Sequence, residues 1–190
     1  ELGNHFADQT DLFRVSSRYM ENLAERCGET VFLSKLEDGE VVYLRRMESP
    51  KSITVVKKLE PRVPAHCTAT GVAMLAFLPS SEVDAILDEH GMEAFNDSTI
   101  TDRDELNRRL EAVRQHEYAV VDGEYNRELL CVAAPVMDHR QRPCAALTVA
   151  MLSAQVEERP ERIQEVGAAV REAAQAFSHE LGGVERLVHA

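Results

Sequence analysis

Two long segments of the chain carry apolar residues three and four positions apart, the spacing of one face of a helix. Near the N-terminus these residues are Leu12, Val15, Tyr19 and Leu23. Near the C-terminus they are Ile163, Val166, Val170, Ala173, Phe177 and Leu181. We expect the first helix to end at Gly28, and the second to begin near Pro160 and end at Gly182.

Between these helices, short apolar runs separated by turn signals predict six strands. The first three runs cover residues 30–36, 41–46 and 53–59, and their short connections predict an antiparallel meander. The last three runs cover residues 118–122, 130–137 and 144–152. The final two are expected to form a hairpin across the turn at residues 138–143.

Three helices are expected between the two groups of strands. Residues 68–78 lack charges and are rich in Ala, Leu and Met, which predicts a buried helix. The next two should begin at caps formed by Ser80 with Ser81 and by Thr101 with Asp104. The last of the three carries an apolar stripe of Leu106, Leu110 and Val113. This order of elements predicts an α+β domain, with one antiparallel sheet of about six strands and helices packed on its faces.

Composition narrows the class of protein. The 190 residues have a formal net charge of -12 and a pI of about 5.0, so this chain is a poor partner for nucleic acid or for anionic membrane surfaces. No apolar run is long enough to span a bilayer, and the chain opens without an initiator Met or a signal peptide. We therefore expect a fragment of a longer cytoplasmic protein, with Cys27, Cys67, Cys131 and Cys144 as free thiols.

The stretch from Pro64 to Gly71 enters the helix expected at 68–78, and the first turn there carries small side chains. Exposed backbone N–H groups and the positive end of the helix dipole attract anions at such a position. Two interpretations stay open. A carboxylate could bind the N–H groups of Ala69, Thr70 and Gly71, or Thr68 could simply cap an ordinary helix.

The last hairpin has one face of small side chains, because side chains alternate across a strand. On its first strand Cys131, Ala133 and Pro135 share that face, and on its second strand Cys144, Ala146, Thr148 and Ala150 do so. A small, mildly polar face can form the floor of a ligand cavity. It can equally admit a closely packed helix.

Asp122 stands at the end of the strand expected at 118–122 and is followed by Gly123 and Glu124. If Asp122 faces the same cavity, its carboxylate can accept a hydrogen bond from a ligand hydroxyl or ammonium group. The alternative is turn chemistry, because Asp-Gly favours tight turns.

Two further functions are possible on chemistry alone. Cys131 and His66 could act as nucleophile and base of a thiol enzyme, although a thiol in an apolar strand is usually inert. His66, Cys67, Cys131 and Asp122 could form a zinc or redox sensor, although these residues are scattered along the chain. The glycine-rich and HExxH motifs of cofactor and metal enzymes do not occur, so no cofactor is predicted.

Three stretches of sequence carry a family likeness. Residues 29–43 contain Glu-Thr-Val and Glu-Val-Val-Tyr, and residues 64–76 contain Pro-Ala-His-Cys-Thr-Ala-Thr-Gly and Met-Leu-Ala. Residues 118–147 contain Tyr-Ala-Val-Val-Asp-Gly-Glu, Cys-Val-Ala-Ala-Pro-Val and Ala-Ala-Leu. In this order and spacing, the motifs resemble the effector-binding domain of the IclR family of bacterial transcription regulators.

The resemblance implies a GAF-like or profilin-like α+β domain at residues 28–190, with residues 1–27 as a linker helix. That helix would lead from a missing N-terminal winged helix-turn-helix domain, through which alone DNA is contacted. The resemblance further implies a regulator that is not an enzyme and does not act at a membrane. A small acid, carboxylate or aromatic, would bind in the pocket and change the arrangement of a homodimer or tetramer on DNA.

The family's pocket positions also transfer to this chain by resemblance. They fall at Ala69, Thr70, Cys131, Thr148 and Ala150, and we add Met74 as a wall residue. The acidic position falls at Val121 or Asp122, and Asp122 is assigned because the motif here resembles the branch that regulates aromatic-acid catabolism. Val72 replaces the family's usual basic residue and Ala150 its usual serine. Both changes lower polarity and favour a larger, more apolar acid over glyoxylate or pyruvate.

Overall fold

The computed structural model describes residues 2–48 and 60–182. Its centre is a six-stranded antiparallel sheet with the strand order β3-β2-β1-β6-β5-β4. The strands are β1 (Thr30–Glu37), β2 (Glu40–Met47), β3 (Arg62–Pro64), β4 (Ala119–Asp122), β5 (Leu129–Met137) and β6 (Pro143–Leu152). Because β1 pairs with β6, the two groups of strands predicted from the sequence join into one sheet.

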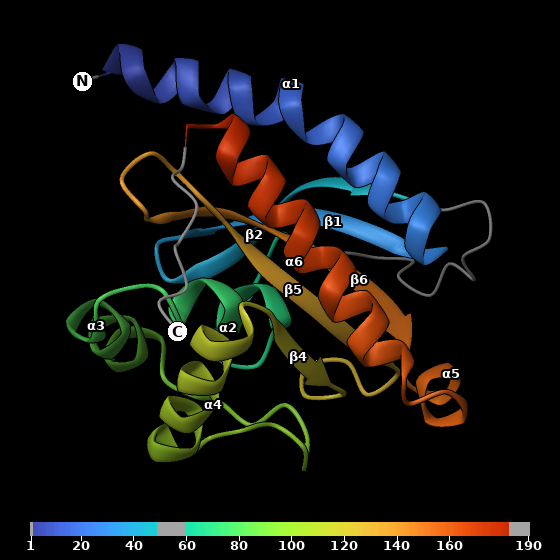
Figure 1. Ribbon diagram of the computed structural model, residues 1–190. Helices are drawn as coiled ribbons and strands as arrows, with labels where there is room; N and C mark the ends of the chain where they lie inside the picture. The colour runs from blue at the N-terminus through green and yellow to red at the C-terminus, as the bar shows by residue number, and fades with distance from the viewer. Residues whose placement is uncertain (1, 49–59, 183–190) are drawn as a thin grey trace.

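Helices cover both faces of the sheet (Figure 1). On one face lie α1 (Leu2–Cys27) and α6 (Arg162–Glu180), and on the other lie α2 (Ala69–Leu75), α3 (Ser80–His90) and α4 (Arg103–His116). The apolar stripes predicted for α1, α4 and α6 are the surfaces that these helices bury. The α+β class and the six-stranded antiparallel sheet are therefore confirmed.

The sheet separates two hydrophobic clusters. Because side chains alternate along β5 and β6, neighbouring residues of these strands belong to different clusters. Val132 of β5 and Val149 of β6 belong to the cluster under α1 and α6, together with the fully buried Phe177. Ala133 belongs to the cluster under α2 and α4, and Cys131 packs against it. The predicted alternation is confirmed along β5 and from Ala145 to the end of β6. It is wrong at Cys144, which packs against the cluster under α1 and α6, because the pairing of β5 with β6 shifts register there.

The caps predicted for two helices are wrong. Pro79 holds the N-cap position of α3 without a side-chain cap bond, so Ser80 is already the first helical residue. At α4 the cap is Asp102 rather than Thr101, and its carboxylate accepts the N–H of Glu105 at 2.8 Å. An ionised acceptor gives a stronger bond than a hydroxyl one position earlier would.

Two short elements, β3 and α5, have no counterpart in the sequence prediction. β3 pairs with β2 and is the last strand in the order of the described sheet, whereas the strand predicted at residues 53–59 lies outside the described residues. The last strand of a sheet tolerates a residue such as Pro64 better than a central strand, which needs ladder hydrogen bonds on both sides. The short helix α5 (Ser153–Glu158) was not predicted, since six residues are too few to display a helical period.

Candidate functional site

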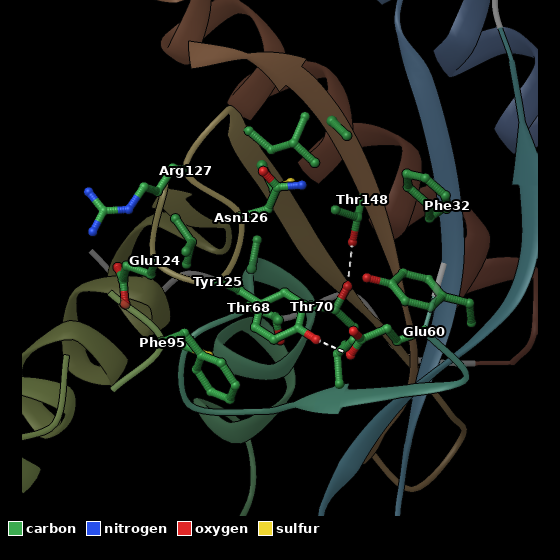
Figure 2. Close-up of a pocket in the computed structure, with 18 residues that line it drawn as sticks. Phe32, Glu60, Thr68, Thr70, Phe95, Glu124, Tyr125, Asn126, Arg127 and Thr148 are labelled. Carbon is green, nitrogen blue, oxygen red and sulfur yellow. Dashed lines mark hydrogen bonds between the residues drawn. The ribbon is translucent and has the colours of Figure 1, made fainter. Parts of the chain in front are cut away.

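A cavity of about 580 Å³ lies on the face of the sheet that α2 covers, close to the N-terminal end of that helix (Figure 2). Its walls come from all six strands, the start of α2, and the loops that follow α3 and β4. The lining residues are Phe32, Tyr43, Glu60, Val63, Cys67, Thr68, Ala69, Thr70, Phe95, Val121, Glu124, Tyr125, Asn126, Arg127, Leu129, Cys131, Thr148 and Ala150. Five of the eight residues predicted from the sequence are therefore brought together: Ala69, Thr70, Cys131, Thr148 and Ala150.

The floor of the cavity is built by strand register. Cys131 of β5 stands opposite Ala150 of β6 and also opposite Val121 of β4. One step along the sheet, Thr148 stands between Ala133 and Phe32. Small side chains in the first row leave open space above the sheet, which is the feature that the sequence pattern predicted.

Thr70 and Thr148 connect the helix to this floor. Their hydroxyl oxygens lie 2.7 Å apart, and both residues are buried. Thr68 caps α2 as the alternative interpretation had it: its hydroxyl accepts the N–H of Gly71 at 3.4 Å and donates to the carbonyl of Pro64 at 2.7 Å. Thr68 therefore caps the helix, whereas Thr70 provides a polar group at the floor of the cavity.

Gly71 and Met74 do not line the cavity. A Cβ atom built on Gly71 would lie 2.2 Å from the carbonyl oxygen of Ala65, so this glycine permits a close approach of two backbone segments. Met74 is buried one turn further along α2. Because the cavity meets α2 at its N-terminal end, residues 67–70 reach it and Met74 does not.

The expectation that Asp122 faces the cavity is wrong. Asp122 is exposed, and its carboxylate accepts a hydrogen bond from the Ser153 hydroxyl at 2.6 Å. Its neighbour Val121 points to the opposite face of β4, as strand alternation requires, and lines the cavity. Of the two positions that the resemblance left open for an acidic residue, the one inside the cavity is the apolar Val121.

Aromatic side chains form much of the remaining wall, and sequence reasoning missed them. Phe32 and Tyr43 lie with ring centroids 5.4 Å apart, and Phe95 meets Tyr125 edge to face at 4.9 Å. Burial raises the pKa of Tyr43 far above its ordinary value, so its hydroxyl stays protonated. These rings come from distant parts of the sequence, and no local spacing connects them.

The rim of the cavity is held by an ion pair whose carboxylate is buried. Glu124 is 3% exposed, and its carboxylate lies 2.6 Å from the guanidinium of Arg109 on α4. The backbone carbonyl of Glu124 accepts hydrogen bonds from the side chains of Thr99 and Asn96, at 2.6 and 3.0 Å. These contacts join the loop after β4 to the loop before α4 and so fix the position of Tyr125.

The charges at the cavity are arranged unevenly. Among the described lining residues, Arg127 is the one cation, and Figure 2 shows its side chain directed away from the Thr70–Thr148 pair. At the mouth, the Tyr125 hydroxyl donates to the carboxylate of Glu60. Polar contacts inside the cavity therefore come from hydroxyl, thiol and backbone groups more than from charges.

The thiols of the cavity do not have the environment of a nucleophile. Burial raises the pKa of both Cys67 and Cys131 to about 12, so both stay protonated. His66 is not among the residues that line the cavity. Its Nε2 atom lies 3.0 Å from the carbonyl oxygen of Glu93. The thiol-enzyme alternative therefore lacks both an ionised sulfur and an adjacent base.

The zinc alternative is not supported by geometry either. Asp122 lies outside the cavity, whereas Cys67 and Cys131 line it. Within residues 12–48 and 60–182, no three His, Cys, Asp or Glu side chains gather closely enough to hold a metal ion. The same part of the chain contains no helix long and apolar enough to cross a membrane.

A six-stranded antiparallel sheet, helices on both faces and a cavity beside α2 define a GAF-like or profilin-like α+β domain. The family model described as "Bacterial transcriptional regulator IclR C-terminal" matches residues 4–179. The chain therefore belongs to the IclR family of bacterial transcriptional regulators, as their C-terminal effector-binding domain. It is a family of regulators and not of enzymes.

Named relatives agree with this assignment. The regulator XynR of Escherichia coli K12 is 28% identical over 178 residues, which are 91% of this chain and 71% of XynR. The regulator KdgR of the same organism is 29% identical over 182 residues, which are 96% of this chain and 68% of KdgR.

Solved structures show the same fold. The C-terminal domain of E. coli KdgR matches 90% of this chain and 99% of its own, with a TM-score of 0.80 and 29% identity. The inducer-binding domain of a double mutant of PobR from Acinetobacter, in complex with 3-hydroxybenzoic acid, matches 87% of this chain and 96% of its own. Its TM-score is 0.77 and its identity 25%.

Proposed function

We propose that this chain senses a small organic acid with an aromatic or otherwise apolar body. The observation that carries the proposal is the cavity of about 580 Å³, a size typical of sites for small molecules. Phe32, Tyr43 and Tyr125 offer faces and edges for a ring. The hydroxyls of Thr70 and Thr148 and the backbone N–H groups at the start of α2 supply donors for a carboxylate.

The complex of PobR with 3-hydroxybenzoic acid supports the aromatic-acid class, because that domain shares this fold. The apolar Val121 and the small Ala150 at the floor also favour an apolar body over a two- or three-carbon acid. Cys131 lies between them and contributes a protonated thiol rather than a charge.

Effector binding regulates the protein by differential affinity. The acid stabilises whichever arrangement of a homodimer or tetramer it binds better, and so shifts affinity for DNA. DNA is contacted by a winged helix-turn-helix domain that precedes residues 1–27, which serve as the linker helix to residues 28–190. The regulator works in the cytoplasm without a membrane partner.

A thermal-shift screen tests the proposal. A panel of 3-hydroxybenzoate, benzoate, cyclohexanecarboxylate and pyruvate separates aromatic, apolar and small acids. An acid present at about 100 times its Kd should stabilise the chain by about 2.7 kcal/mol and raise Tm by several degrees. Ala150→Phe, which fills the floor, should abolish the shift, whereas Asp122→Ala should keep it. If no acid in the panel raises Tm, the acid-sensor function is rejected.

A further inference from the structure

A β-bulge in β2 lies between the cavity and α1. The pairing of β1 with β2 shifts register, so that Leu33 stands opposite Arg45 and Ser34 stands opposite Tyr43. Leu44 is the extra residue of the bulge. In a regular strand, Tyr43 and Arg45 would point to the same face, because they are two residues apart. The bulge turns them to opposite faces of the sheet.

Tyr43 lies on the cavity side of the bulge. Its ring lines the cavity and contacts Phe32, which stands beside Thr148 on the floor. A molecule that fills the space above Thr148 therefore has Tyr43 as one of its walls. Displacement of this ring acts on β2 at the point where the bulge interrupts the ladder of hydrogen bonds.

Arg45 lies on the other side and reaches α1. Its Nη1 atom is 3.0 Å from the carbonyl oxygen of Phe13, 3.0 Å from the hydroxyl of Ser16 and 2.6 Å from the hydroxyl of Ser17. Ser16 is fully buried, and its hydroxyl also donates to the Phe13 carbonyl at 2.9 Å. In a regular helix the Phe13 carbonyl also accepts the N–H of residue 17, so it belongs to the hydrogen-bond ladder of α1. Arg45 therefore binds the backbone of α1 as well as its serine side chains.

We propose that Arg45 is a positioning residue that couples the cavity wall at Tyr43 to α1. The proposal rests on the proposed function for what occupies the cavity, while the coupling itself is a property of the free chain. A shift of Tyr43 moves the bulge, and the bulge carries the Arg45 guanidinium with it. The hydrogen bonds of Arg45 to Phe13 and Ser17 then change. In this way, occupation of the cavity alters how firmly α1 is bound to the sheet.

Amide hydrogen exchange in residues 14–18 of α1 tests the coupling without any ligand. Arg45→Met keeps the apolar stem but removes the donors, and should accelerate exchange there about tenfold. Tyr43→Leu should accelerate it about threefold in the parent chain and add nothing in the Arg45→Met background. Tyr125→Leu makes the same substitution on the loop side of the cavity and should leave α1 exchange unchanged.

Exchange in residues 166–177 of α6 separates coupling from general loss of stability, and Tyr43→Phe provides a milder variant if Tyr43→Leu loosens the whole domain. Acceleration confined to α1, and lost when Arg45 is replaced, supports the proposal. An equal effect of Tyr43→Leu in both backgrounds, no effect of Arg45→Met, or the same acceleration in α6 for Arg45→Met and for both Tyr43 variants overturns it. None of these outcomes depends on an acid binding, so failure of the effector proposal would be seen separately, in the thermal-shift screen.

Discussion

The hydroxyl groups of Thr70 and Thr148 lie 2.7 Å apart, and this hydrogen bond joins the first turn of α2 to β6 across 78 positions of sequence. Either hydroxyl can be the donor, so the pair keeps one O–H hydrogen and several lone pairs for a molecule in the cavity. It is thus both a structural link and the polar centre of the candidate site.

Replacing one threonine by valine should cost more than the bond itself is worth. Thr148→Val leaves the buried Thr70 hydroxyl without its partner, which should lower the free energy of unfolding by about 1–3 kcal/mol. Thr70→Val should act similarly. The double variant should cost less than the sum, because neither buried hydroxyl then remains unpaired. Urea unfolding measures this cycle, and strictly additive losses would show that the two groups do not interact.

The ion pair of Glu124 with Arg109 should stabilise the rim. Glu124→Gln removes one partner of a pair in which the carboxylate is buried and the guanidinium partly exposed. We expect a loss of about 2 kcal/mol in urea unfolding, below the range for fully buried pairs. Arg103→Gln is the control, on the helix that carries Arg109, because the pairs of Arg103 with Asp84 and Asp88 are exposed and worth about 0–1 kcal/mol. Equal losses in both variants would contradict this assignment.

His66 should make stability depend on pH. Burial lowers the pKa of His66 below its ordinary value of 6.5, and this outweighs the opposing hydrogen bond to the Glu93 carbonyl. The unfolded chain therefore binds a proton at higher pH than the folded chain. The contribution of the neutral imidazole is complete above about pH 7 and is lost as the pH falls below about 6.5 towards the folded-state pKa.

Urea midpoints measured between about pH 7 and pH 5 reveal this dependence. His66→Gln keeps a hydrogen-bond donor for Glu93 but cannot titrate, so its stability should fall less steeply over that interval. The same substitution at the exposed His139 is the matched control. A parent and a His66→Gln variant with the same slope would show that this histidine does not titrate differently on folding.

Gly71 should be irreplaceable for a packing reason rather than for ligand contact. In Gly71→Ala the new Cβ meets the backbone of Ala65 at 2.2 Å, which cannot yield without moving the entry to α2. We expect a loss of about 2 kcal/mol or more in urea unfolding. At Gly167 a Cβ meets the ring of Tyr118 at 2.5 Å, and a side chain can move. Tyr118→Ala should therefore rescue Gly167→Ala, whereas no side-chain truncation should rescue Gly71→Ala.

The sequence predicts the sheet and its covering helices well, because both follow from apolar periodicity. Alternation along β5 and β6 also predicted the cavity floor at Cys131, Thr148 and Ala150. It failed at Asp122 because β4 is only four residues long, and so short an element does not reveal which of two neighbours faces inward.

The rest of the site is not encoded locally. Phe95 and Tyr125 lie in loops, and they meet because Glu124, Asn96 and Thr99 fasten those loops together. The bulge at Leu44 is equally hidden, since an extra residue in a strand leaves no mark in composition. Such features depend on contacts between segments far apart in the chain.

Calorimetric titration with 3-hydroxybenzoate and the other acids of the panel tests the central claim most directly. The account predicts saturable binding of one aromatic or apolar acid per chain, its loss in Ala150→Phe, and its retention in Asp122→Ala. Binding that survives Ala150→Phe unchanged, or the absence of binding by every acid in the panel, would contradict it.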